Sequence, residues 1–335
     1  MASSRHLALH ATLPERYARF DLLASTIDHK GRLLALLVDP TQQEGAAALP
    51  WRRRETWSLP VLRFDATVVI CDGGDVHEIP LHGLDQWFSK IDTFGEGVIL
   101  GVQRISHFDT NRAQEDLIPA NEDDLTRNVR VFDCAGDPVG AFYAGDGINQ
   151  LLTDPDGRIW ISYIDEATYR LPNPDGTWSS SEMPGLARWD APDSDPWFAF
   201  NDTGSAVFWC DCYALNVGQS LVRACPYVDF PVVEIDARGA RSITPNPVTR
   251  CRGLAVSGST FAFLDQDRRG NAVTWEIRYA HRQDATIAET GGEALLLPGG
   301  RPPTSWAQGR IGRDANLWLY EDGNPRQWYR FEIDS

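Results

Sequence analysis

The segment YIDEATYR, residues 163–170, places two adjacent carboxylates beside two phenols and a guanidinium. Converging carboxylates can bind Ca²⁺ or Mg²⁺, because these cations prefer oxygen ligands. One carboxylate can instead act as a general base, since a neighbouring negative charge raises its pKa. The segment therefore predicts Asp165 and Glu166 as catalytic residues and Tyr169 as a ligand contact, with Ca²⁺ or Mg²⁺ left open as a cofactor.

A second group of such side chains lies in the segments WCDCY, PYVDF and TRCRG, between residues 209 and 253. Asp211 is the third carboxylate that we expect to take part in catalysis. The alternative for all these carboxylates is that they only form turns, which the Asp side chain favours. The other expected ligand contacts combine aromatic surface with charge: Tyr213, Tyr227, Asp229, Arg252 and Trp306.

Three cysteines are expected near this second group. If Gly218-Gln219 forms a two-residue hairpin turn, Cys212 lies directly opposite Cys225, and Cys251 enters the next strand at the same end. Such thiols could hold zinc or form a redox pair, but no CxxC spacing is present. Because a free cysteine is commonly a small buried hydrophobe, ordinary core packing is the alternative.

Composition and missing motifs exclude several classes of function. The sequence contains no HExxH, GxSxG or phosphate-binding loop. Its formal net charge of -16 opposes binding to nucleic acid and to anionic membranes. No apolar run approaches the ~20 residues of a membrane-spanning helix, and no secretion signal is recognisable. We therefore expect a cytoplasmic protein with reduced cysteines, which acts on a small molecule or a protein partner.

The elements that must position these residues repeat along the chain. A short β-rich segment recurs every ~40–70 residues, a period typical of propellers and solenoids. Its copies include VLRFD ending at Asp65, VRVFD at Asp133, LARWD at Asp190 and VVEID at Asp236. Tight turns followed by strand-like runs precede several copies, as in residues 28–39, 153–165 and 313–322.

This pattern predicts an all-β chain of four-stranded antiparallel blades, arranged as one six-bladed β-propeller over residues 1–335. A single four-stranded sheet cannot cover both of its apolar faces, whereas sheets stacked radially cover one another. The last repeat, about 304–333, lacks an outer strand. We expect the alternating segment at residues 6–13 to supply that strand and to close the ring.

The repeated hairpin DPDGRIWIS resembles those of six-bladed propellers of the NHL and SMP-30/gluconolactonase type. The resemblance covers nearly the whole chain and concerns the fold. It implies a site where loops surround the central channel. In the SMP-30 class it also implies a divalent cation held by carboxylate and amide side chains. Glu15 and Asn149 have suitable chemistry for such a site but lie in no diagnostic motif.

Two functions follow from these observations. The first is a small-molecule-binding propeller with its site at the channel mouth, acting as a hydrolase, lyase or cyclase through carboxylates with or without a divalent metal. The second is a non-catalytic scaffold for protein partners, which the absence of catalytic motifs supports. A ligand site predicts titratable groups with perturbed pKa values among the named residues. A scaffold predicts a broad exposed patch.

Overall fold

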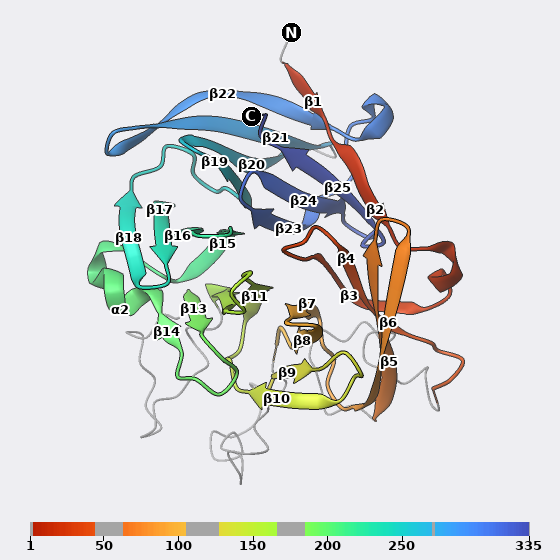
Figure 1. Ribbon diagram of the computed structural model, residues 1–335. Coiled ribbons are helices and arrows are strands. Elements are labelled where there is room, and N and C mark those ends of the chain that lie inside the picture. The colour runs from red at the N-terminus through yellow and green to blue at the C-terminus, as the bar shows by residue number, and fades with distance from the viewer. Residues whose placement is uncertain (1–2, 44–62, 105–126, 166–184, 270–271, 335) are drawn as a thin grey trace, which may run out of the picture. The chain divides into compact units, whose positions relative to one another are not determined.

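The computed structural model describes residues 3–43, 63–104, 127–165, 185–269 and 272–334. The chain divides into two compact units, which are treated separately below. Unit 1 comprises Met1–Leu13, Pro184–Leu186 and Phe198–Ser335, and unit 2 comprises Pro14–Met183 and Ala187–Trp197. The regular secondary structure of the described residues is almost entirely β-strand (Figure 1), as the sequence predicts, and no helix among them is long and apolar enough to cross a membrane.

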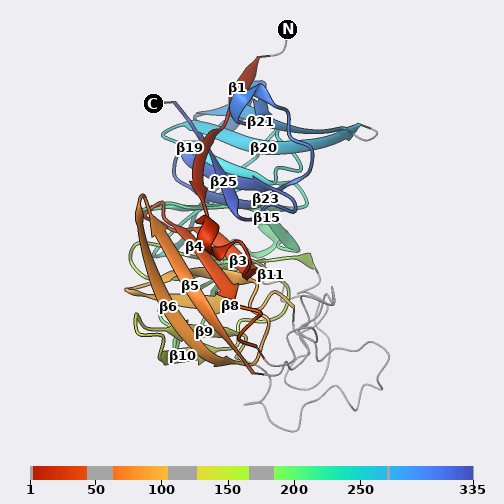
Figure 2. The ribbon, with the colours of Figure 1, turned by 90° about the vertical axis from the view of Figure 1, so that its right-hand side faces the viewer.

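Unit 2 is built from four-stranded antiparallel sheets that follow one another along the chain. Figure 2 shows β3 to β6 side by side in the first of them. The three sheets are β3 (Asp21–Ile27), β4 (Leu33–Val38), β5 (Phe64–Asp72) and β6 (Asp75–Leu84); β7 (Lys90–Phe94), β8 (Gly97–Gly101), β9 (Val129–Phe132) and β10 (Pro138–Phe142); and β11 (Ile148–Thr153), β12 (Ile159–Tyr163), β13 (Leu186–Trp189) and β14 (Trp197–Phe198).

Unit 1 repeats this order of strands. The helical turns among the described residues are short: η1 (Glu15–Tyr17) belongs to unit 2, and α2 (Ala199–Thr203), η5 (Gly204–Ala206) and η6 (Pro298–Gly300) belong to unit 1. The strands are β15 (Asp211–Val217), β16 (Val222–Tyr227), β17 (Val232–Asp236) and β18 (Gly239–Thr244); β19 (Gly253–Ser257), β20 (Thr260–Arg269), β21 (Ala272–Gln283) and β22 (Thr286–Leu296); and β23 (Ala307–Arg313), β24 (Asn316–Glu321) and β25 (Gln327–Glu332). The repeated segments ending at Asp190 and Asp236 form β13 and β17, whereas the segment PWFAFN (residues 196–201) forms only the two-residue β14 before it turns into α2.

The N-terminal segment adds a strand to two sheets of unit 1. β1 (Ser4–His6) pairs in parallel with the end of β22, an addition that the sequence reading did not include. β2 (Ala8–Thr12) pairs antiparallel with β25, with Ala8 opposite Arg330. β23, β24, β25 and β2 are therefore consecutive strands of one sheet, which continues from β23 to β15 through a parallel pairing of Gly312 with Asn216.

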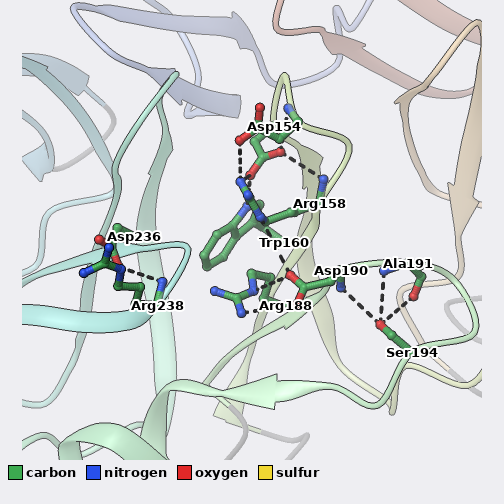
Figure 3. Close-up of polar contacts among 10 residues, drawn as sticks. Asp154, Arg158, Trp160, Arg188, Asp190, Ala191, Ser194, Asp236 and Arg238 are labelled. Carbon is green, nitrogen blue, oxygen red and sulfur yellow. Dashed lines mark hydrogen bonds and ion pairs between the residues drawn. The ribbon is translucent and has the colours of Figure 1, made fainter.

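The repeated turns explain why the sequence forms these hairpins. The Asp154 Oδ1 accepts hydrogen bonds from the backbone N–H groups of Asp156 and Arg158, at 3.0 and 2.9 Å. Its other oxygen accepts from the indole nitrogen of Trp160 (Figure 3). Asp28 holds the turn before β4 through the same backbone bonds, to Lys30 and Arg32. Asp therefore acts as a turn-forming residue at these positions.

The first strands of successive sheets within unit 1 are tied together by one amide. Asn216 on β15 donates to the carbonyl oxygens of Leu254 at 3.0 Å and Asp314 at 2.9 Å, and it accepts from the Asp314 N–H. Gly312 permits this approach, because a Cβ there would collide with the carbonyl oxygens of Leu254 and Leu215. β15 pairs in parallel with β23, and the Val256 N–H of β19 donates to the carbonyl oxygen of Asp314, so the three first strands run in the same direction in unit 1.

Apolar residues between neighbouring sheets form the core of each unit. Leu36, Val68 and Leu100 are fully buried in unit 2, and Leu264, Ile277 and Leu319 are fully buried in unit 1. Trp160, Trp275 and Trp318 lie within strands, and each is at most 6% exposed. The apolar faces are thus covered by neighbouring sheets, as the repeat predicted.

Candidate functional site

The candidate site lies at the end of unit 1 where β15, β19 and β23 begin. Two of these strands carry a β-bulge there. In β15 the register shifts between Cys212 and Ala214, so Tyr213 is an extra residue. In β23 it shifts between Gln308 and Ile311, so Gly309 and Arg310 face a single residue of β24. A bulge turns a side chain away from the ordinary alternation of a strand and often lies beside a functional site.

Gly309 is required at the second bulge. Its φ is +71°, in the region that favours glycine, and a Cβ would collide with the rings of Trp328 and Tyr320. Those two rings lie edge to face, with centroids 4.9 Å apart. The packed rings therefore fix the backbone immediately before Arg310.

Arg252, just before β19, lies over the ring of Tyr213. Its Cζ is 4.2 Å from the ring centroid, a cation–π distance. Phe230 stacks with Tyr213 at 6.0 Å and an interplanar angle of 17°, and Tyr227 packs edge-on against both rings. The aromatic rings thus hold Arg252 in one place.

Arg310 and Asp211 complete the charges of this group. The Arg310 Nη1 donates to the carbonyl oxygen of Ala307 at 2.9 Å. Burial and the positive charge of Arg252 lower the pKa of Arg310 to about 10, although Tyr320 and Asp211 act in the opposite direction. Asp211 is 3% exposed. Asp211 is thus buried, whereas Arg252 and Arg310 are half-buried. The parallel pairing of Asn216 with Gly312 places β15 and β23, which carry Asp211 and Arg310, side by side.

We call Asp211, Tyr213, Arg252, Arg310 and Tyr320 the arginine cluster. Burial raises the pKa of Tyr320, so its phenol stays neutral and can donate a hydrogen bond. Guanidiniums and phenols are donors that suit an oxyanion, and a buried carboxylate can accept a proton. The cluster has the groups to bind and polarise a small oxygen-containing molecule.

Only some of the residues that the sequence predicts for the site lie in the arginine cluster. Asp211, Tyr213 and Arg252 lie in the arginine cluster, and Tyr227 packs beside it with 40% of its surface exposed. Asp229 is exposed in the turn after β16, and Trp306 is half-buried before β23. Asp165 is exposed after β12 in unit 2, whereas Glu166 and Tyr169 lie outside the described residues.

The expected pairing of Cys212 with Cys225 is wrong. The turn between β15 and β16 is longer than two residues, since Val217 pairs with Val222 and the Gly218 N–H donates to Leu221. Together with the bulge, this places Pro226 opposite Cys212 and Ala214 opposite Cys225.

The three thiols nevertheless gather in the core of unit 1, where Cys212, Cys225 and Cys251 are all fully buried. A hydrogen bond with Cys251, followed by burial, raises the pKa of Cys225 well above its usual value. Burial also raises the pKa of Cys212. Thiols held protonated in this way are poor nucleophiles, which agrees with a packing role.

The described residues contain no group of three or more His, Cys, Asp or Glu side chains placed to hold a metal ion. Glu15, named through the family resemblance, is exposed in η1 of unit 2. Asn149 is the extra residue of a bulge in β11, equivalent to that of Tyr213 in β15. These two positions are therefore not part of a described metal site.

Unit 2 has a smaller polar group at the start of β11. The Nε of Arg104 lies 3.6 Å from the Oδ2 of the fully buried Asp146. The Tyr163 hydroxyl donates to the carbonyl oxygen of Ala144 at 2.5 Å. Burial and the nearby Asp146 raise the pKa of Tyr143. The hydrogen bond of Tyr163 is to the backbone, so we assign these residues to the support of the loop before β11.

Arg310 and Tyr320 were missed by sequence reasoning. Both lie inside segments that read as strands, where a regular alternation would assign Arg310 no special position. The dipeptide Gly309-Arg310 early in a strand is the available signal, because glycine within a strand often marks a bulge.

No family model and no curated protein matches this sequence. Solved structures with a similar fold include streptogramin B lyase, at 12% identity and a TM-score of 0.44, covering 98% of this chain and 97% of that one. A gluconolactonase from Xanthomonas campestris, XC5397, gives 12% identity, a TM-score of 0.37 and coverage of 99% and 97%. The β-propeller domain of Cps50 from Myceliophteria thermophila gives 10% identity, 0.42, and 98% of both chains. The chain thus resembles a gluconolactonase and a β-propeller domain, the two descriptions that its hairpins suggested.

Proposed function

We propose that this protein is a small-molecule-binding β-propeller whose ligand binds at the arginine cluster. The observation that carries the proposal is the pair of bulges, which bring Tyr213 and Arg310 out of strand alternation beside Arg252 and a buried carboxylate. Such irregularities weaken a strand ladder and persist where they position functional groups. Because an equivalent bulge occurs at Asn149 in β11, it is the charged side chains beside the bulges of β15 and β23 that favour a ligand site over a scaffold.

We further propose that the whole chain forms a six-bladed β-propeller. Six successive groups of four strands are described, and β2 supplies the fourth strand of the last. Support comes from the pairing of β2 with β25 and from Asn216, which joins neighbouring first strands. In such a ring the arginine cluster belongs to the face where inner strands begin, which is where propeller ligands collect.

The chemistry best suited to the cluster is hydrolysis, elimination or cyclisation at an activated oxygen-bearing carbon. In that reaction Asp211 accepts a proton, and the guanidiniums of Arg252 and Arg310 bind the ligand through its oxygen atoms and stabilise negative charge on them. Preorganised donors in a water-poor site stabilise such charge strongly. Binding and catalysis separate experimentally, because only catalysis requires the Asp211 carboxylate.

A thermal-shift screen of small molecules tests the proposal. Compounds that raise the melting temperature of the wild type should lose that effect in Tyr213→Leu and Arg252→Gln. They should keep it in Arg238→Gln, which replaces an exposed arginine elsewhere in unit 1. Compounds that stabilise all four proteins equally would place the binding site elsewhere. A wild type stabilised only by a protein partner would favour the scaffold function.

A further inference from the structure

Arg252 and Arg310 differ from many other arginines of unit 1 in having no ion pair with a described carboxylate. The described side-chain contact of Arg252 is the Tyr213 ring, and that of Arg310 is a backbone carbonyl. By contrast, these arginines each lie within 4 Å of a carboxylate oxygen: Arg5, Arg223, Arg241, Arg278, Arg282, Arg301 and Arg330.

The charge of the cluster is unusual for this protein. Among the described residues of the cluster there are two guanidiniums and one carboxylate, in a chain whose formal net charge is -16. Two guanidiniums that lie close together repel each other, which destabilises the fold. The positive charge of Arg252 lowers the pKa of Arg310 through such repulsion. A single bound negative charge would relieve this repulsion, whereas the surrounding acidic protein disfavours a more highly charged anion.

The two guanidiniums are also held before any ligand arrives. The Tyr213 ring contacts both Phe230 and Arg252, and Arg310 donates to the carbonyl oxygen of Ala307. Because the planar guanidinium matches the two oxygens of a carboxylate, arginine is the residue best suited to bind that group. Preorganisation lowers the entropy lost on binding.

We propose that the ligand of this site carries one carboxylate, which Arg252 and Arg310 bind together. This inference rests on the proposed function and adds the chemical class of the ligand. Asp211 then lies near the bound carboxylate, so the part of the ligand that it faces is neutral or a hydrogen-bond donor.

Titration with benzoate, its uncharged isostere benzamide and inorganic phosphate tests this inference. We expect saturable binding of benzoate to the wild type, with benzamide and phosphate at least about tenfold weaker. Arg252→Gln and Arg310→Gln should each weaken benzoate binding by about tenfold or more. Arg310→Lys should lose less, because it keeps the charge, and Arg238→Gln should not change binding. Circular dichroism melting curves establish that each variant is folded.

The other outcomes separate the two proposals. If benzamide binds as tightly as benzoate and Tyr213→Leu removes both, the site binds small molecules but the carboxylate inference is wrong. If phosphate binds more tightly than benzoate, the ligand class is also wrong. If none of the three binds to the folded wild type at the cluster, the inference fails. A thermal-shift screen that also finds no ligand at the cluster would contradict the proposed function as well.

Discussion

At the scale of single residues, the site depends on positions where the backbone departs from a regular strand. Tyr213 and Arg310 belong to bulges, and Gly309 permits the second bulge through its positive φ of +71°. The side chains of the cluster are consequently fixed by the packing behind them. Substitution of a residue behind the cluster should therefore change ligand binding, even though that residue does not contact the ligand.

Gly309→Ala should destabilise the protein by about 2 kcal/mol or more, because the added methyl group strains the backbone and meets Trp328 and Tyr320. It should also weaken benzoate binding by displacing Arg310. Gly323→Ala is the matched control, since its φ is +84° but its Cβ would meet nothing within 4 Å. Chemical denaturation and titration measure both effects. Unchanged binding in a folded Gly309→Ala protein would show that the bulge does not position Arg310.

The affinity for benzoate should depend on pH through the positive charge of Arg310. Burial and the charge of Arg252 lower its pKa to about 10, so the free protein loses this positive charge as the pH rises through that value. Benzoate stays charged throughout, and its affinity should therefore be constant below pH 9 and fall above about pH 10. Arg310→Gln should lack this fall. An identical decline in the variant would assign it to another group.

At the scale of secondary-structure elements, Asn216 holds the first strands of unit 1 together. Replacing it with Ala leaves the carbonyl of Leu254 and the N–H of Asp314 without the side chain that they contact. The expected loss of stability is about 2 kcal/mol. Urea unfolding measures it, and a loss below about 0.5 kcal/mol would show that these strands do not depend on the amide.

Glu234 should make unit 1 sensitive to acid. Burial raises its pKa, but hydrogen bonds from Arg282, Ser242 and Arg223 outweigh that effect and lower it. The stabilisation is therefore present above the usual pKa of Glu and lost as the pH falls through the lowered value. Glu234→Gln should cost about 3 kcal/mol at pH 7, with the difference shrinking in acid.

Glu289→Gln provides the comparison for Glu234→Gln. The Nη2 of Arg278 lies 2.6 Å from the Oε1 of Glu289, but both side chains are about one third exposed. Such a pair contributes about 0.5 kcal/mol. Equal losses in the two variants at pH 7, or a constant difference for Glu234→Gln between pH 7 and pH 3, would contradict the assignment.

The hairpins could be predicted because their signals are local. An Asp followed by a Gly turn specifies the hairpin at residues 28–32 and again at 154–158, where one carboxylate binds two backbone N–H groups. The register of β15 and β16 could not be predicted in this way. Its turn has no such signal, and the bulge at Tyr213 depends on packing against Arg252 and Phe230.

At the scale of the whole molecule, the N-terminal segment pairs with the C-terminal strands. Leu7 and Leu13, which flank β2, are 3% and 5% exposed, and Leu7 packs in the core beside β25. The sequence pointed to this segment because the last repeat lacked an outer strand. The site was harder to predict, because Arg252 and Arg310 are 58 positions apart (310 − 252) and meet only through the packing of three strands.

Removal of residues 1–13 should lower the melting temperature by about 10 °C or more and promote aggregation, because it exposes the edge of β25 and uncovers apolar surface. A peptide with the sequence of residues 1–13 should restore part of the loss when added in excess. Calorimetry and light scattering measure these effects. A truncated protein as stable as the full chain would refute the stabilising role of the pairing between β2 and β25.

The most direct measurement is a crystal structure of the wild-type protein soaked with benzoate. We predict density for one benzoate whose carboxylate oxygens lie within hydrogen-bond distance of both Arg252 and Arg310. Benzoate bound elsewhere with this cluster unoccupied, or the two guanidiniums turned away from each other toward other carboxylates, would contradict the account.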